Sequence, residues 1–214
     1  EPRMARGKAT LRALLQICDF LVNGAGFCEA LSASDSSGKP MIYRVIEKAL
    51  SDQDGWPLAD IFDGNHAKDC TRSCYKCLQR YGNRPYHGLL DWRLGLSYLR
   101  TFIDEDFQCG LDGDFSAIEL KDWPELCYDA ALRMQHYMDN AIEIRLLDCK
   151  LVALFPKQGK GTAVLITHPL WEDRFTYNSV MGTASSEIGV KKPLTMSSFK
   201  LIRRPANLAA EIRG

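Results

Sequence analysis

Hydrophobic positions in the middle of the chain recur with the period of an α-helix. Between residues 89 and 103, apolar side chains return every three or four positions, at Leu89, Trp92, Leu96, Leu99 and Ile103. This spacing places them on one helical face, so the pattern predicts an amphipathic helix.

A second helix is expected to begin at Asp122. Its carboxylate can accept a hydrogen bond from the first helical turn, and Glu125, three residues later, completes the pattern of a capping box. Apolar residues then follow at helical spacing, at Leu126, Ala130, Met134 and Tyr137.

The pattern changes to the period of a β-strand after residue 141. Ile142, Ile144 and Leu146 alternate with polar residues, and residues 151–155 and 164–167 predict a hairpin. The loop between the two hairpin strands contains Gly159, Lys160 and Gly161, but it lacks the spacing of a Walker A loop and precedes a strand. We therefore predict a turn there and no nucleotide site.

Three cysteines, Cys70, Cys74 and Cys77, lie within eight residues of one another. Thiolates two to four residues apart can all point at one Zn²⁺ ion. The alternative is three buried hydrophobic side chains, but the neighbouring residues are mostly polar or charged. The cluster therefore predicts a zinc site with one further ligand to be found.

Three residues are candidates for the fourth ligand. Our first choice is Cys28, because a predicted strand over residues 17–22 enters a turn at Gly24 and Gly26 that can begin a helix carrying Cys28. His87 is the second candidate and His66 the third. Four protein ligands would make the metal structural, because no position stays open for water.

The cysteine region resembles the C-terminal cysteine domain of MrfA-type superfamily 2 DNA helicases. Related domains occur in proteins of the DISARM and Druantia anti-phage systems. The resemblance covers roughly residues 17–103 and rests on Asn23-Gly24-Ala25-Gly26-Phe27-Cys28 and on Cys70-x3-Cys74-Tyr75-x-Cys77-Leu78-x2-Tyr81-x-Asn83-x3-His87-x2-Leu90-Asp91. It implies a zinc-binding accessory domain that works with an ATP-driven DNA motor, in the same chain or as a partner subunit.

This sequence departs from the family at two positions. Trp92 stands where the family usually has Arg, and Arg93 follows it. Lys68 stands where MrfA-like members often have a fourth cysteine, which is why the search for a ligand turns to Cys28.

The chain has no net charge, but its charges are unevenly distributed. Between residues 68 and 93 there is an excess of four positive charges, whereas residues 104–129 are strongly acidic. We therefore expect an α+β protein with a small zinc-stapled α/β module over residues 1–103, an acidic linker over 104–121, and a helix plus small antiparallel sheet over 122–214.

Four basic residues of the zinc region are candidates for nucleic-acid binding: Arg72, Lys76, Arg80 and Arg84. Tyrosines lie between them, at Tyr75, Tyr81 and Tyr86. Basic side chains neutralise phosphates and aromatic rings stack on bases, so the mixture would suit single-stranded DNA. The alternative is a solvated surface, or one that packs against a neighbouring protein.

No catalytic motif is evident. Asp148 and Lys150 faintly resemble part of a nuclease site, so a nuclease or other metal-dependent DNA-processing enzyme is the alternative function, but no second carboxylate stands beside them in the sequence. His168 has no nucleophile nearby and is expected in a packed turn.

Sequence features also bear on the cellular compartment. The chain begins at Glu1 and contains neither 18 consecutive apolar residues nor a signal-peptide pattern. We therefore expect a cytoplasmic part of a larger protein, with reduced cysteines and no membrane segment.

Overall fold

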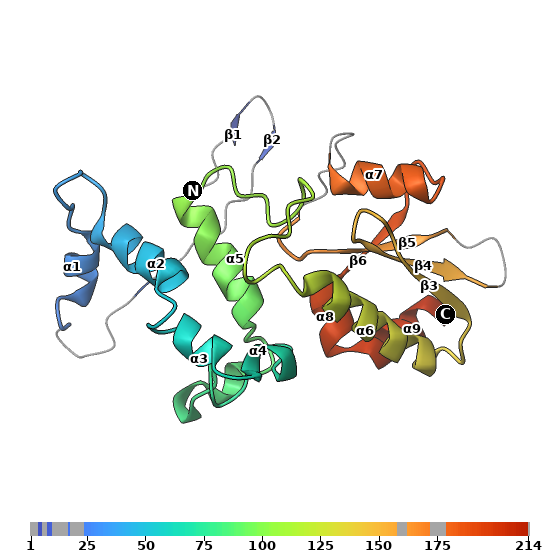
Figure 1. The fold of residues 1–214 in the computed structure, drawn as a ribbon, viewed down its shortest axis with the longest axis horizontal. Coiled ribbons are helices and arrows are strands. Elements are labelled where there is room, and N and C mark those ends of the chain that lie inside the picture. The colour runs from blue at the N-terminus through green and yellow to red at the C-terminus, as the bar shows by residue number, and fades with distance from the viewer. Residues whose placement is uncertain are drawn as a thin grey trace. The chain divides into compact units, whose positions relative to one another are not determined.

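The computed structural model describes residues 4–5, 8–9, 17, 24–157, 162–171 and 179–213 (Figure 1). The chain divides into two compact units, residues 1–47 and residues 48–214. The division falls inside helix α2 (Met41–Ser51).

The first unit contains a two-stranded antiparallel pair, β1 (Met4–Ala5) with β2 (Lys8–Ala9), and helix α1 (Phe27–Ser32). Gly24 and Gly26 precede α1 with φ angles of 67° and 74°, a region that glycine adopts without strain. The predicted glycine turn and the helix carrying Cys28 in its first turn are confirmed. The predicted strand over residues 17–22 lies outside the described residues except for Ile17.

The second unit begins with short helices. After α3 (Leu58–Phe62) and α4 (His66–Asp69) come the 3₁₀ helix η1 (Tyr81–Tyr86) and the longer α5 (Trp92–Ile103). The helix predicted over residues 89–103 is confirmed, but it begins at Trp92, because the Asp91 side chain accepts a hydrogen bond from the Leu94 amide and caps it. Leu89 precedes the helix and is 62% exposed.

Helix α6 (Trp123–Tyr137) begins where the sequence predicts, but its cap differs. Asp122 occupies the N-cap position without a side-chain capping bond, so the predicted capping box is wrong. The Asp122 carboxylate instead forms an ion pair with Arg93. Pro124, in the first turn, has no N–H group and therefore leaves one fewer donor to be capped.

The sheet contains four strands in the order β3 (Ile142–Leu146), β4 (Val152–Pro156), β5 (Val164–Thr167) and β6 (Leu194–Ser197). The first three pair antiparallel, which confirms the predicted strands. β6 pairs parallel with β5, so the sheet is mixed and not purely antiparallel as expected. The predicted α+β class is confirmed.

Helices cover both faces of this sheet. Figure 1 shows α6, α8 (Ser198–Arg203) and α9 (Pro205–Arg213) on one side and α7 (Val180–Glu187) on the other. The α6 helix contacts α8, α9, β3 and β4, and Met134 of α6 is fully buried. Burying such a side chain contributes roughly 1.5–3 kcal/mol, so this core fixes the C-terminal half of the unit.

His168 follows β5 and packs against two tryptophans. Its ring centroid lies 5.6 Å from that of Trp123 and 6.1 Å from that of Trp171. The side chain is 3% exposed, and burial lowers the pKa of His168 to about 4. The prediction of a packed turn is confirmed.

Candidate metal centre

One helical turn places the first two side chains of the metal centre. Helix α4 runs from His66 to Asp69, and the Cys70 amide donates to the His66 carbonyl over 2.8 Å. Residues four positions apart in a helical turn lie on the same side. The turn therefore directs His66 and Cys70 toward one point.

His66, Cys70, Cys74 and Cys77 form a group that can hold a metal ion, with their ligand atoms all within 4.8 Å of one another. The sulfur atoms of Cys70 and Cys77 lie 3.9 Å apart. Two sulfurs bound to one tetrahedral zinc, each at about 2.3 Å, would lie about 3.8 Å apart. His66 Nε2 is 3.1 Å from the Cys74 sulfur. The donor set and the spacing both fit zinc.

The second nitrogen of His66 fixes the orientation of the ring. Nδ1 lies 2.8 Å from the carbonyl oxygen of Ile61, which can only accept, so Nδ1 carries the proton. In the neutral ring, Nε2 then presents its lone pair to the three sulfurs. Histidines that bind metals commonly have such a bond to their other nitrogen.

Backbone amides stabilise negative charge on the sulfurs. The Cys74 amide donates to the Cys77 sulfur over 3.2 Å, and the Lys76 amide donates to the Cys74 sulfur over 3.4 Å. Both amides belong to the turn that joins the two cysteines. The turn therefore stabilises the thiolate form of the cysteines, which is the form that binds a metal.

The thiols of Cys70 and Cys74 differ in how readily they ionise. Burial, with the neighbouring Cys77 and Cys74 sulfurs, raises the pKa of Cys70 to about 12. For Cys74, burial also raises the pKa, but the Lys76 amide, His66 and the Cys77 amide outweigh it and lower the value to about 7. A divalent cation would offset the repulsion between neighbouring thiolates, because it binds the deprotonated thiols directly.

Of the three candidates for the fourth ligand, the structure brings His66 to the cysteines. Cys28 belongs to the first unit, where its thiol donates to the Ile17 carbonyl over 3.4 Å. His87 Nε2 lies 3.0 Å from the Arg80 carbonyl and 2.9 Å from Asn83 Oδ1. Of the two histidine candidates, which both belong to the second unit, His66 rather than His87 joins the cysteines. The signal for it was the four-residue spacing from His66 to Cys70.

The chain leaves the metal group through a surface segment that we call the aromatic–basic loop, residues 75–89. Its tyrosines Tyr75, Tyr81 and Tyr86 are 66%, 83% and 60% exposed. Lys76, Arg80 and Arg84 are exposed as well, whereas Arg72, just before the loop, is partly buried. Within the described residues, none of these four basic side chains forms an ion pair with a carboxylate.

Polar side chains hold the aromatic–basic loop in shape. Asn83 accepts from the Arg80 amide over 2.8 Å and donates to the Leu78 carbonyl over 3.0 Å. The ring of His87 meets that of Tyr75 edge to face, with centroids 5.4 Å apart. The Asn83 and His87 positions of the motif are therefore structural supports of the loop.

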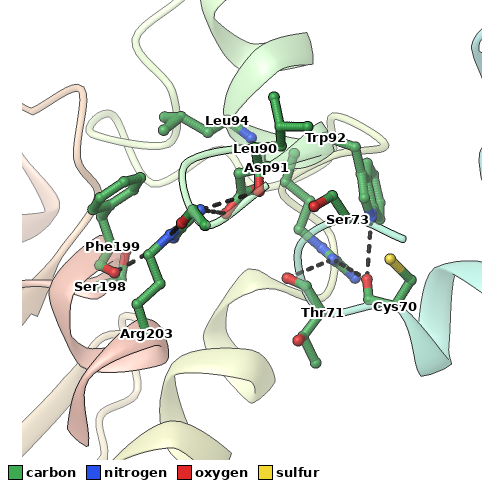
Figure 2. Close-up of polar contacts among 12 residues, drawn as sticks. Cys70, Thr71, Ser73, Leu90, Asp91, Trp92, Leu94, Ser198, Phe199 and Arg203 are labelled. Carbon is green, nitrogen blue, oxygen red and sulfur yellow. Dashed lines mark hydrogen bonds and ion pairs between the residues drawn. The ribbon is translucent and has the colours of Figure 1, made fainter. Parts of the chain in front are cut away.

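The segment that carries His66 and Cys70, which we call the metal segment, and the aromatic–basic loop are each hydrogen-bonded to a different helix (Figure 2). Trp92, at the start of α5, donates through Nε1 to the Cys70 carbonyl over 3.1 Å. Arg203, from α8, donates to the carbonyls of Gly88 and Leu90 over 3.0 and 3.3 Å and to Asp91 over 3.2 Å. The Trp92 bond therefore connects the cysteine segment to α5, and the Arg203 bonds connect the end of the loop to the C-terminal half of the second unit.

A small pocket elsewhere in the unit gathers charged side chains. Asp112, Asp148 and Lys150 line it, and its volume is about 180 Å³. Asp112, which stands far from Asp148 and Lys150 in the sequence, thus lines the same pocket. The described part of the chain has no second convergent group of three or more His, Cys, Asp or Glu ligands.

No family model, no curated protein and no solved structure matches this chain. The resemblance of residues 17–103 to helicase-associated cysteine domains therefore stays an expectation from the sequence. None of the helices in the described ranges has the length and apolar composition needed to cross a membrane.

Proposed function

We propose that this protein is a noncatalytic zinc-binding accessory module that contacts DNA and works with an ATP-dependent DNA helicase or translocase. The motor would be in the same chain or a partner subunit, and the process would be anti-phage defence or DNA repair. The observation that carries the proposal is a four-ligand metal group that continues directly into an exposed aromatic–basic loop. The helicase and the process rest on the sequence resemblance alone.

Zinc is the metal that suits the donor set best. Three thiolates and one imidazole are common ligands of structural zinc, and Mg²⁺ and Ca²⁺ prefer oxygen. Because the protein supplies all four ligands, no coordination position is open for water or substrate. The metal would therefore stabilise the fold of the loops instead of taking part in catalysis.

DNA is the partner that suits the surface beside the metal. Lys76, Arg80 and Arg84 offer positive charge to phosphates, and charge neutralisation does not depend on base sequence. The exposed rings of Tyr75 and Tyr81 offer flat faces on which unpaired bases can stack. Together these groups favour a single strand, whose bases are accessible, over a duplex.

The salt dependence of DNA binding tests this proposal. The double variant Arg80→Gln/Arg84→Gln should bind a single strand more weakly at every sequence. Its slope of log affinity against log salt should fall by about 0.7 per lost contact on a single strand.

The matched control is Lys191→Gln/Lys192→Gln, which removes two exposed charges far from the loop in sequence. Zinc content should stay unchanged in both variants. If the two double variants bind DNA with the same affinity and slope as the wild type, the loop does not bind DNA.

A separate observation tests the association with a motor. Walker motifs in residues encoded upstream of Glu1, or in a protein that copurifies with this chain, would support it. If that motor translocates on DNA with ATP equally well without the residues of this chain and without zinc, the association is contradicted.

A second candidate function, DNA cleavage, is favoured by the pocket that contains Asp112, Asp148 and Lys150. Two carboxylates can hold a divalent cation for metal-assisted hydrolysis, and a lysine can stabilise developing negative charge. Incubation of the protein with Mg²⁺ and plasmid DNA distinguishes the candidates. Cleavage that disappears in Asp148→Asn would replace the noncatalytic proposal, whereas intact plasmid would support it.

A further inference from the structure

Arg93, which binds no metal, uses every hydrogen-bond donor of its guanidinium in a buried position. The residue is 4% exposed. Nε donates to Asp122 Oδ1 over 2.9 Å, and Nη2 donates to Asp122 Oδ2 and, over 2.8 Å, to the Ala67 carbonyl. Nη1 donates to the carbonyls of Cys70 and Thr71 over 3.1 and 3.4 Å. Five N–H groups thus meet five acceptors.

The three carbonyls belong to the segment that presents the first two metal ligands. Ala67 directly follows His66, and Thr71 directly follows Cys70. Helix α4 is only four residues long, so its last carbonyls have no amide partner within the helix. Arg93 supplies a partner to one of them, the Ala67 carbonyl, and to the Cys70 and Thr71 carbonyls just past the helix, so it holds the segment at both ends.

The same guanidinium group also binds a residue outside the metal segment. Asp122 stands at the N-cap position of α6 and binds Arg93 instead of capping that helix. Since α6 packs on α8, α9 and the sheet, the anchor stands at the start of a helix of the C-terminal core. The metal segment is therefore fixed to an element that contributes no ligand.

We infer that Arg93 is a positioning residue of the metal centre: it sets the spacing of His66 and Cys70 from the C-terminal core, so metal affinity depends on it. This inference rests on the proposed zinc function. A lysine cannot replace Arg93, because an ammonium group has three donors and no planar fork. Its three donors would leave at least two of the five acceptors without a bond from residue 93.

The test compares Arg93→Lys with Arg100→Lys. Arg100 lies on the same helix and donates two bonds, of 2.8 and 3.0 Å, to the fully buried Glu119, but it has no bond to the metal segment. Zn²⁺ affinity is measured by competition with a chelating dye, and the absorption spectrum of the Co²⁺-substituted protein reports ligand geometry.

Arg93→Lys should lower Zn²⁺ affinity by about 10- to 100-fold, the range found for residues that orient metal ligands, and should alter the Co²⁺ spectrum. Arg100→Lys should lower the stability of the fold but keep the wild-type affinity and spectrum. Asp122→Asn keeps Arg93 and weakens its anchor, so it should shift affinity in the same direction as Arg93→Lys. If Arg93→Lys does not fold, Asp122→Asn tests the inference in its place.

Three results are decisive. A wild-type protein that binds no zinc contradicts the proposed function and this inference with it. Tight zinc binding by the wild type with unchanged affinity in Arg93→Lys, or in a folded Asp122→Asn, overturns the inference alone. An equal loss in Arg93→Lys and Arg100→Lys also overturns it, because the effect would then be one of general stability.

Discussion

Replacing His66 by alanine removes the nitrogen ligand of the metal group, whereas replacing Cys28 by serine leaves that group intact. The structure therefore predicts opposite results for the two variants. His66→Ala should lose most of its zinc at a limiting metal concentration, and Cys28→Ser should keep it. Competition with a chelating dye measures both affinities under the same conditions.

The size of the effect follows from the contacts. Structural zinc sites contribute about 10–16 kcal/mol, so one ligand in four is worth roughly 2.5–4 kcal/mol, or about 100- to 1000-fold in affinity. The variant also leaves the carbonyl of buried Ile61 without its 2.8 Å partner, a further cost of about 1–3 kcal/mol. By contrast, the thiol of Cys28 has one long contact of 3.4 Å, and its loss should change stability by less than about 0.5 kcal/mol.

A rescue variant separates ligation from packing. His66→Cys offers a fourth sulfur, so it should recover zinc and shift the Co²⁺ spectrum toward that of a site with four thiolates. If Cys28→Ser loses the metal while His66→Ala retains it, the ligand assignment is wrong and Cys28 binds the zinc.

Two further predictions concern residues outside the ligand set. Burial lowers the pKa of His168 from 6.5 to about 4 in the folded protein, so between these pH values the unfolded chain binds a proton that the folded chain does not. The free energy of unfolding of the wild type should therefore fall by about 3 kcal/mol relative to that of His168→Asn as the pH drops from 6.5 to 4. Urea unfolding followed by tryptophan fluorescence measures this difference, and parallel pH profiles of the two proteins would contradict it. Arg203→Gln removes the bonds that order residues 88–91, so affinity for a single strand should fall by about fivefold while zinc content stays at the wild-type value. Equal affinity in filter binding would show that Arg203 does not order the loop.

The elements that the sequence predicted are those with a periodic or a continuously apolar pattern. Helix α5 follows the helical period and β3 alternates apolar with polar residues, whereas β4 and β5 are short, mostly apolar runs. β6 is four residues long, and half of them are polar. It is a strand because it pairs with β5, and such pairing between distant segments leaves no local signal.

The three sulfurs of the candidate metal centre were predicted directly, whereas His66 was only the third choice for the fourth ligand. The spacing of Cys70, Cys74 and Cys77 indicates a metal by itself, but a ligand four residues before the first cysteine depends on a helix of only four residues. So short a helix has no periodic pattern to mark it. The choice of Cys28 relied instead on its family-like surroundings.

The capping prediction at Asp122 failed for a related reason. The local sequence Asp122-x-x-Glu125 fits a capping box, but Arg93, 29 residues earlier, takes the carboxylate. A buried guanidinium needs a charged partner more than a helix end needs its cap, since an unpaired buried charge costs about 3–5 kcal/mol and a lost cap about 1 kcal/mol. The long-range contact therefore decides the local structure.

X-ray absorption spectroscopy at the zinc edge, with elemental analysis of the same sample, tests the central claim most directly. The account predicts about one zinc per chain, bound by three sulfurs at about 2.3 Å and one nitrogen at about 2.0 Å. It also predicts that Cys74→Ser loses the metal and much of the structure of the second unit, because metal binding here contributes to folding. Protein purified without zinc that neither takes up the ion nor changes its unfolding when zinc is added would contradict the account.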